Sequence, residues 1–227
     1  MPSKNRIKVY KKDGVYHIYN RGVDKRRIFM DEQDYAVFLH LLKYYLSPPG
    51  DKEKHPLSDT STAVIRPRPI ENLHQEVDLL AYCLMPNHFH LLVKQKTVDG
   101  MTKLMRRLCT IYSMYFNRRH KRTGHLFENR YKAVLVDSND YLLHLSRYIH
   151  LNPIELTGTV PVSWPYSSFA YYIGLKKAKW VKPMLVLGCF YKIEKSKLFG
   201  KSYNSYKEFV LDIKEDSKEI VGKLSID

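Results

Sequence analysis

The feature that most constrains this chain is a pair of histidines directly after a tight turn. Pro86-Asn87 is typical of a turn, and the residues that follow alternate and then become apolar, as in a buried strand. Successive side chains of a strand point to opposite faces, so His88 and His90 share one face and Phe89 takes the other. Two imidazoles on one strand face can bind a single metal ion. The pair alone also fits two surface or half-buried histidines, so other residues must decide.

The charge of the chain indicates a polyanionic partner. Its 227 residues include 38 Lys and Arg against 23 Asp and Glu, a formal net charge of +15. This surplus favours nucleic acid, and the 18 Tyr, 9 Phe and 2 Trp offer rings on which unpaired bases can stack. Anionic lipid is the weaker alternative, because no basic amphipathic helix with an aromatic face stands out.

Composition also indicates a cellular compartment. No run of about 18 apolar residues occurs, so no membrane span is expected. The basic N-terminus, residues 1–6, has no apolar segment behind it, which argues against secretion. Cys83, Cys109 and Cys189 are far apart and odd in number, as expected for free thiols in a reducing compartment. We therefore expect a cytoplasmic protein.

Hydrophobic periodicity divides most of the chain into strands and helices. Apolar residues alternate in the predicted strands and recur at helical spacing in the predicted helices. The strands are expected at residues 15–21, 77–85, 88–94 and 133–136, and the first two helices at 31–46 and 99–119. Asp31 is the expected N-cap of the first helix.

A third helix is predicted to follow an N-cap at Asp137 or Ser138 and to run to about residue 150. It is expected to end before Asn152-Pro153 because proline disfavours helix in the residue before it. At about 100° per residue, His144, Tyr148 and Asn152 form one row beside the core-facing stripe. Taken alone, Tyr148 fits a tyrosine at the rim of the core, and Asn152 fits an ordinary helix stop.

Two segments differ in composition from these elements. Residues 47–75 are rich in Pro, Ser, Thr and charge, which predicts a flexible insertion between a helix and a strand. Residues 176–227 predict a helical C-terminal extension. Its expected apolar anchors are Tyr203, Tyr206 and Phe209. Residues 1–175 are then one domain of α+β class, with a ferredoxin-like central antiparallel sheet that carries the histidines and helices packed on one side.

Seven short motifs occur in an order that resembles one known family. They span about residues 14–174 and are Asn20-Arg21-Gly22, Arg27-Ile28-Phe29, Leu84 to Leu92, Gly124-His125-Leu126-Phe127, Arg130-Tyr131-Lys132, Tyr148 to Pro153 and Trp164-Pro165-Tyr166-Ser167-Ser168. Together they resemble the REP-associated tyrosine transposases, relatives of the single-strand transposases of bacterial insertion sequences within the HUH endonuclease superfamily. One motif would be weak evidence, whereas seven in order are specific.

The resemblance implies the HUH endonuclease fold and a metal-dependent tyrosine transposase that cuts and rejoins single-stranded DNA beside palindromic hairpins. His88 and His90 match the histidine pair of the family, Tyr148 its nucleophile and Asn152 its third metal ligand. The implied cofactor is Mg²⁺ or Mn²⁺, although imidazole and amide ligands do not exclude zinc. Attack by Tyr148 would form a 5′-phosphotyrosine link and free a 3′-hydroxyl.

Basic side chains near these motifs are candidate DNA contacts. A basic loop at residues 24–27 and the basic face of the helix at 99–119 both fit a track of phosphates, although either also fits a solvated surface. The candidates are Arg21, Lys25, Arg26, Arg27, Arg106, Arg107 and Arg130. The expected partner is single-stranded or hairpin DNA, with the protein nucleoid-associated when bound, as a monomer or a homodimer.

Two other functions remain open at this point. One is a relaxase or a replication-initiator-type HUH nickase, and the other is a non-enzymatic nucleic-acid-binding module. Relaxases generally carry a third histidine and a longer chain, and no third histidine closely follows His90. Loss of cutting with binding retained in a Tyr148→Phe variant would argue against the binding module.

Tyr112 and Tyr115 are rival nucleophiles, because they lie on the helix directly after the histidine strand. Neither has an amide side chain four residues later, whereas Tyr148 has Asn152 at that spacing. Tyr112 also lies among apolar residues and is expected in the core. The spacing therefore favours Tyr148.

Overall fold

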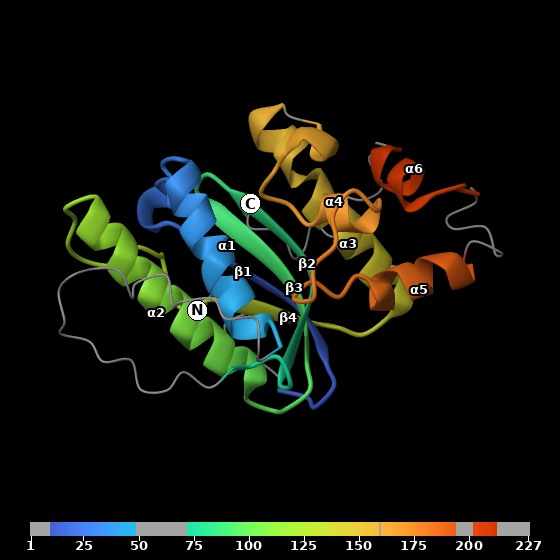
Figure 1. Cartoon of the computed structure of the whole chain (residues 1–227), viewed down its shortest axis with the longest axis horizontal. Coiled ribbons are helices and arrows are strands. Elements are labelled where there is room, and N and C mark those ends of the chain that lie inside the picture. The colour runs from blue at the N-terminus through green and yellow to red at the C-terminus, as the bar shows by residue number, and fades with distance from the viewer. Residues whose placement is uncertain (1–9, 49–71, 159, 194–201, 213–227) are drawn as a thin grey trace, which may run out of the picture.

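Four strands form one antiparallel sheet at the centre of the molecule (Figure 1). The computed structural model describes residues 10–48, 72–158, 160–193 and 202–212. The strands are β1 (Val15–Arg21), β2 (Val77–Met85), β3 (His88–Gln95) and β4 (Lys132–Val136), in the order β2-β3-β1-β4. Strand β1 pairs antiparallel with β3 and β4, and β2 pairs antiparallel with β3. The predicted strand bounds agree with these to within one residue.

Two helices cover the first face of the sheet. Helix α1 (Glu32–Leu46) follows β1 and α2 (Gly100–Arg119) follows β3, so the chain order and the strand order give the predicted ferredoxin-like topology. Asp31 caps α1 as predicted, since its side chain accepts from the backbone N–H of Gln33 and Asp34. Phe38 of α1 and Phe89 of β3 are fully buried between these helices and the sheet.

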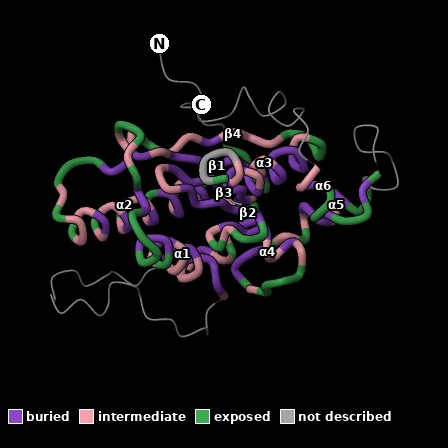
Figure 2. Tube along the Cα trace, turned by 90° about the horizontal axis from the view of Figure 1, so that it is seen from above, coloured by how far each residue is buried: buried purple, intermediate pink, exposed green. Residues whose placement is uncertain are grey.

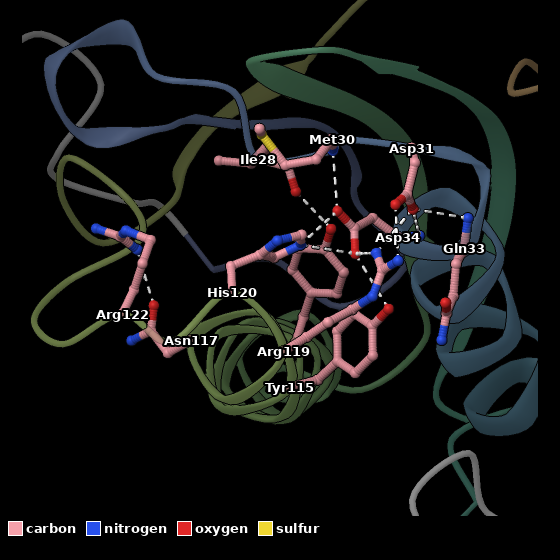
Figure 3. Close-up of polar contacts among 11 residues, drawn as sticks. Ile28, Met30, Asp31, Gln33, Asp34, Tyr115, Asn117, Arg119, His120 and Arg122 are labelled. Carbon is pink, nitrogen blue, oxygen red and sulfur yellow. Dashed lines mark hydrogen bonds and ion pairs between the residues drawn. The ribbon is translucent and has the colours of Figure 1, made fainter.

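A buried carboxylate on α1 hydrogen-bonds to side chains of α2 (Figure 3). The side chain of Asp34, on α1, is fully buried. Its oxygens accept from Arg119 Nη1 at 2.6 Å and from the Tyr115 hydroxyl at 3.0 Å, both on α2. They also accept from the backbone N–H of Met30 at 2.9 Å, and His120 Nε2 lies 3.0 Å away. One carboxylate therefore links α1, the end of α2 and the loop between β1 and α1.

A second layer of helices covers the other face. Helix α3 (Asn139–Thr157) packs on β2, and α5 (Met184–Ile193) and α6 (Tyr206–Leu211) pack on α3. Figure 2 shows α1 and α2 on one side of the strands and α3, α5 and α6 on the other. The predicted α+β class is confirmed. Helices α1 and α2 form the predicted layer on one side of the sheet, whereas α3 belongs to a second layer on the other side, which the sequence does not predict.

The predicted end of α3 is wrong. The helix runs through Asn152 and Pro153 to Thr157 and ends where Gly158 adopts a left-handed conformation with φ 66°. Proline removes one backbone hydrogen bond and disfavours helix in the preceding residue, so sequence preference alone ends the helix near residue 150. Ile149 and Asn152 are almost fully buried, and this packing outweighs the local preference.

The C-terminal helices join the core through α3. His150 of α3 has its Nδ1 3.0 Å from the Tyr206 hydroxyl and its Nε2 2.9 Å from Ser168 Oγ. The Tyr206 hydroxyl also donates to Ser146 Oγ at 2.9 Å. The predicted anchors are buried: Tyr203, Tyr206 and Phe209. Residues 194–201 and 213–227 of the predicted extension lie outside the described residues, and the domain division at residue 175 stays a prediction.

The remaining elements are short. They are the 3-10 helices η1 (Val23–Lys25) and η2 (Pro161–Ser163), and helix α4 (Phe169–Tyr172). Of the predicted insertion at 47–75, residues 49–71 lie outside the described part of the chain. Its two ends meet, because the Leu73 N–H donates to the Tyr45 carbonyl at 2.8 Å. All three cysteines are free thiols. None of the helices in the described ranges is long and apolar enough to span a membrane.

Candidate functional site

Three histidines lie side by side on the sheet face that α3 covers. His88 and His90 share this face of β3, as predicted, with ring centroids 4.9 Å apart. His17, on the neighbouring strand β1, stacks on His90 with 5.0 Å between centroids. Its Nε2 lies 2.8 Å from Nδ1 of His90. His17 and His90 are fully buried and His88 is 6% exposed, so three polar rings occupy the interior between sheet and helix.

One turn of α3 faces these histidines. The ring of Tyr148 lies 5.4 Å from that of His90, centroid to centroid. Asn152 Oδ1 lies 3.2 Å from His88 Nε2, and Asn152 Nδ2 donates to the Tyr148 carbonyl at 3.2 Å. This second bond turns the amide oxygen towards His88. His144, in the same row of α3, is also buried. The structure thus brings Tyr148, Asn152 and the histidine pair together.

The atoms at this point suit a divalent cation. Asn87 Oδ1 lies 2.8 Å from His88 Nδ1, and a neutral imidazole has a single N–H. When that N–H donates to Asn87, the Nε2 lone pair of His88 faces the Asn152 oxygen, so these two residues would be suited to hold a cation. His90 Nε2 is buried and has no hydrogen-bond partner in the described part of the chain. Within the described ranges no three His, Cys, Asp or Glu side chains form a metal-binding group. Asn152 Oδ1, which faces His88, is the candidate third ligand.

Burial keeps the inner histidines neutral. Burial, with a smaller contribution from His88 nearby, lowers the pKa of His17 to about 3. The pKa of His90 also lies well below its usual value, first through burial and then through His88 and His17. A neutral imidazole offers a lone pair to a metal, whereas an imidazolium does not. These rings are therefore in the form that binds a cation at neutral pH.

The rival tyrosines lie on the other side of the sheet. Tyr112 is fully buried among the residues between α2 and the sheet, and its hydroxyl donates to the carbonyl of Ile28. Burial raises its pKa far above the usual value. The Tyr115 hydroxyl donates to Asp34. The predicted core position of Tyr112 is confirmed, and the sheet separates both tyrosines from the histidines.

The basic loop after β1 lies against the turn that precedes His88. The Gly22 N–H donates to the Asn87 carbonyl at 2.9 Å, and the Ile28 N–H donates to the Pro86 carbonyl at 2.8 Å. Asn87 Nδ2 also donates to the Lys25 carbonyl at 3.3 Å. A side chain at Gly22 would collide with the Arg26 carbonyl, so the loop requires glycine there. Lys25 and Arg27 are exposed.

The other basic candidates are distributed unevenly. Arg21 pairs with His88 in the strand register, but its guanidinium binds Glu128 at 2.9 Å. Arg130 is exposed shortly after Glu128 in the same loop. Arg106 and Arg107 lie on α2, which covers the face of the sheet opposite the histidines. The structure therefore gathers the loop at 24–27 and Arg21 near the site, and does not bring Arg106 or Arg107 to it.

The sequence predicts no role at the site for two residues, His17 and Asn87. For His17 it predicts only a strand position, although alternation places this residue on the face opposite Tyr16 and Ile18, where a buried polar residue needs an explanation. For Asn87 it predicts only a turn. Its contact with His88 depends on a side-chain rotation that the sequence does not encode in any pattern.

Together, the fold and the site define a class of protein. In this class a ferredoxin-like sheet carries a His-x-His pair beneath a helix that presents a tyrosine and an asparagine. Residues 70–152 match a family model described as "Transposase IS200 like". A curated relative from Haemophilus influenzae, described as a REP-associated tyrosine transposase, is 30% identical over 111 residues, which are 42% of this chain and 61% of the relative. The chain thus aligns with less than two thirds of that protein.

A solved structure has the same fold. It is described as a REP-associated tyrosine transposase bound to a REP hairpin, and it superposes with a TM-score of 0.52 at 16% identity over 79% of this chain and 92% of its own. The HUH fold expected from the motifs is therefore confirmed. Together with the family model and the curated relative, it confirms the resemblance to the REP-associated tyrosine transposases.

Proposed function

We propose that this protein is a single-stranded DNA endonuclease and strand transferase that acts at palindromic hairpin sites. The observation that carries the proposal is the meeting of Tyr148 and Asn152, on one turn of α3, with His88 and His90. The match to the IS200-like transposase model supports it, and so does the solved relative described with a REP hairpin. Transposase activity, hairpin DNA as partner and metal dependence are all part of this proposal.

In the proposed reaction the Tyr148 hydroxyl oxygen attacks the phosphorus of a phosphodiester. A bond forms between that oxygen and phosphorus, and the bond from phosphorus to the 3′ oxygen breaks. The phenol proton is lost to solvent, and the released 3′ oxygen takes up a proton. The 5′-phosphotyrosine preserves a high-energy ester, so the 3′-hydroxyl of another strand can reverse the step without ATP. This outcome is strand transfer, in contrast to hydrolysis.

The proposed metal ligands are His88 Nε2, His90 Nε2 and Asn152 Oδ1, and the proposed ion is Mg²⁺ or Mn²⁺. When bound, such an ion supplies positive charge that offsets the negative phosphate oxygens. The chain itself fixes the nucleophile relative to a ligand, because Tyr148 and Asn152 are one helical turn apart and joined by a hydrogen bond. Burial of His90 excludes water from this side of the site.

The DNA is proposed to approach over the loop at 24–27. This loop is fastened to the turn before His88, so phosphates held by Lys25 or Arg27 lie beside the strand that carries the ligands. The net charge of +15 supports a polyanionic strand. Residues 176–227 are proposed as an extension that braces α3, because Tyr206 contacts both Ser146 and His150 on either side of Tyr148 in sequence.

The decisive experiment traps the covalent link. The protein is incubated with a library of single-stranded hairpin oligonucleotides and Mn²⁺, and the adduct is isolated under denaturing conditions. Protease digestion and mass spectrometry then identify the modified peptide, and sequencing identifies the DNA. We expect the nucleotide on the peptide that contains Tyr148.

Three tyrosine variants complete this test. Tyr148→Phe is expected to lose the adduct while its circular dichroism is unchanged, because the hydroxyl is the nucleophile. Tyr112→Phe removes the rival, and Tyr141→Phe is a matched change on the same helix; both are expected to keep the adduct. An adduct on residues 106–118 would overturn the roles of Tyr148 and Asn152. Hairpin binding without any adduct would favour a binding module.

A further inference from the structure

Each imidazole of the histidine pair has its second nitrogen held by a polar side chain. His17 Nε2 lies 2.8 Å from Nδ1 of His90, and Asn87 Oδ1 lies 2.8 Å from Nδ1 of His88. The two supporting residues come from different elements, β1 and the turn between β2 and β3. In both rings Nε2 is therefore the nitrogen that these two side chains do not contact, and in His88 it lies 3.2 Å from Asn152 Oδ1.

We propose that His17 is a positioning residue that accepts the Nδ1–H of His90 and so directs the Nε2 lone pair of His90 into the site. Asn87 has the same role for His88. This inference rests on the proposed metal site. A histidine that binds metal through Nε2 must carry its proton on Nδ1, and that N–H needs an acceptor when it is buried.

The burial pattern supports this role for His17. His17 is fully buried and its Nε2 contacts His90, whereas its Nδ1 has no hydrogen-bond partner among the residues that the structure describes. A polar ring with half of its hydrogen-bonding capacity unused is a poor choice for packing alone. The rings of His17 and His90 are stacked, with 18° between their planes, so the contact also fixes the tilt of the His90 ring. His90 thus has its hydrogen-bond partner on the neighbouring strand of the sheet.

The amide of Asn87 is oriented by a separate contact. Its Nδ2 donates to the Lys25 carbonyl at 3.3 Å, which leaves Oδ1 pointing at His88. An amide oxygen only accepts hydrogen bonds, so this orientation requires the proton of His88 on Nδ1. The Asn87 contact thus imposes this tautomer on His88, and the proposed role of His17 gives His90 the same tautomer.

The first test measures Mn²⁺ affinity by electron paramagnetic resonance, without DNA. His17→Leu removes the acceptor and should weaken Mn²⁺ binding by about 10-fold to 100-fold, the usual effect of losing a residue that supports a metal ligand. His17→Gln places an oxygen near the position of Nε2 and should stay within a few-fold of the unaltered protein. His17→Asn, whose amide ends near the position of Nδ1, is too short to reach His90 and should resemble His17→Leu while keeping a polar group.

The control is His150→Gln, which changes another fully buried histidine that contacts Tyr206 and Ser168 instead of the pair. Its Mn²⁺ affinity should be unchanged, although its thermal stability should fall. The second measurement is the ¹⁵N spectrum of the imidazoles with bound Mg²⁺. We expect His90 protonated on Nδ1 in the unaltered protein, with this state lost in His17→Leu and restored in His17→Gln.

The outcomes separate this inference from the proposed function. Equal Mn²⁺ affinity in His17→Leu, His17→Asn and the unaltered protein would overturn the role of His17 and leave the metal site standing. Failure of the unaltered protein to bind Mn²⁺ would overturn the metal site and this role together. Mn²⁺ binding that depends on His17, in a protein that forms no DNA adduct, would support the inference and overturn the strand-transfer reaction.

Discussion

Replacement of Asp34 by alanine tests whether one buried carboxylate holds α1 and α2 together. The change removes the acceptor of Arg119, of the Tyr115 hydroxyl and of the Met30 N–H at once. Removal of one partner from a buried ion pair costs about 3–5 kcal/mol. The side chain of Arg119 is 27% exposed and keeps Asp31 at 2.7 Å, so water and Asp31 offset part of the loss. We therefore expect a decrease in the free energy of unfolding near the lower limit, about 3 kcal/mol.

Thermal unfolding followed by circular dichroism measures this effect. For a chain of this size, a loss of about 3 kcal/mol lowers the Tm by roughly 6–12 °C. Asp34→Asn keeps the volume and one acceptor and should lose less. The matched control is Asp31→Asn, because Asp31 is exposed and asparagine can still cap α1. Equal decreases in Tm for Asp34→Ala and Asp31→Asn would refute the reasoning, since burial would then contribute nothing.

Three further predictions concern the metal ligands, the partner and pH. His88→Ala or His90→Ala should abolish cleavage and keep hairpin binding within a few-fold in gel-shift assays; full cleavage by either variant in chelator would contradict the metal site. Binding should be tighter to single-stranded or hairpin DNA than to duplex, with a steep salt dependence, and a plain duplex that wins the competition would contradict it. Burial lowers the pKa of His150 to about 3, so the unfolded chain binds the extra proton below pH 6.5 and stability falls as pH falls. At pH 5 the expected decrease in the free energy of unfolding is about 2 kcal/mol, which urea unfolding measures. The stability of His150→Gln should depend less steeply on pH.

The local parts of the fold were predictable because their patterns repeat over a few residues. Alternation located the strands and put His88 and His90 on one face, and helical spacing put Tyr148 and Asn152 in one row. The end of α3 was not predictable in this way. The preference against helix before Pro153 is local, whereas the packing of Ile149 and Asn152 that overrides it comes from β2 and β3, far away in sequence.

The composition of the site depended on pairings that no single segment contains. His17 reaches His90 only because β1 lies beside β3 in the sheet, a register set by the whole topology. The same topology places α2 on the far face, which separates Arg106 and Arg107 from the histidines although all lie close in sequence. Glu128 likewise meets Arg21 across 107 residues. Charge indicated a polyanionic partner, and the order of the motifs resembled a family of DNA-cutting enzymes, but the side of the sheet on which each basic residue lies had to come from the structure.

The loop after β1 has a consequence for how proteins of this design can diverge. It is held to the histidine strand mainly through its backbone, by the N–H groups of Gly22, Ile28 and Phe29 and the carbonyl of Lys25. The side chains at positions 24, 25 and 27 contribute little to that attachment. In the proposed function, substitution at position 27 can therefore alter the contact with DNA while the backbone bonds to the turn before His88 are kept. Positions 24 and 25 are more constrained, because Asp24 and Lys25 have positive φ. In the proposed enzyme, target choice and chemistry would thus be adjacent in space and could still change separately.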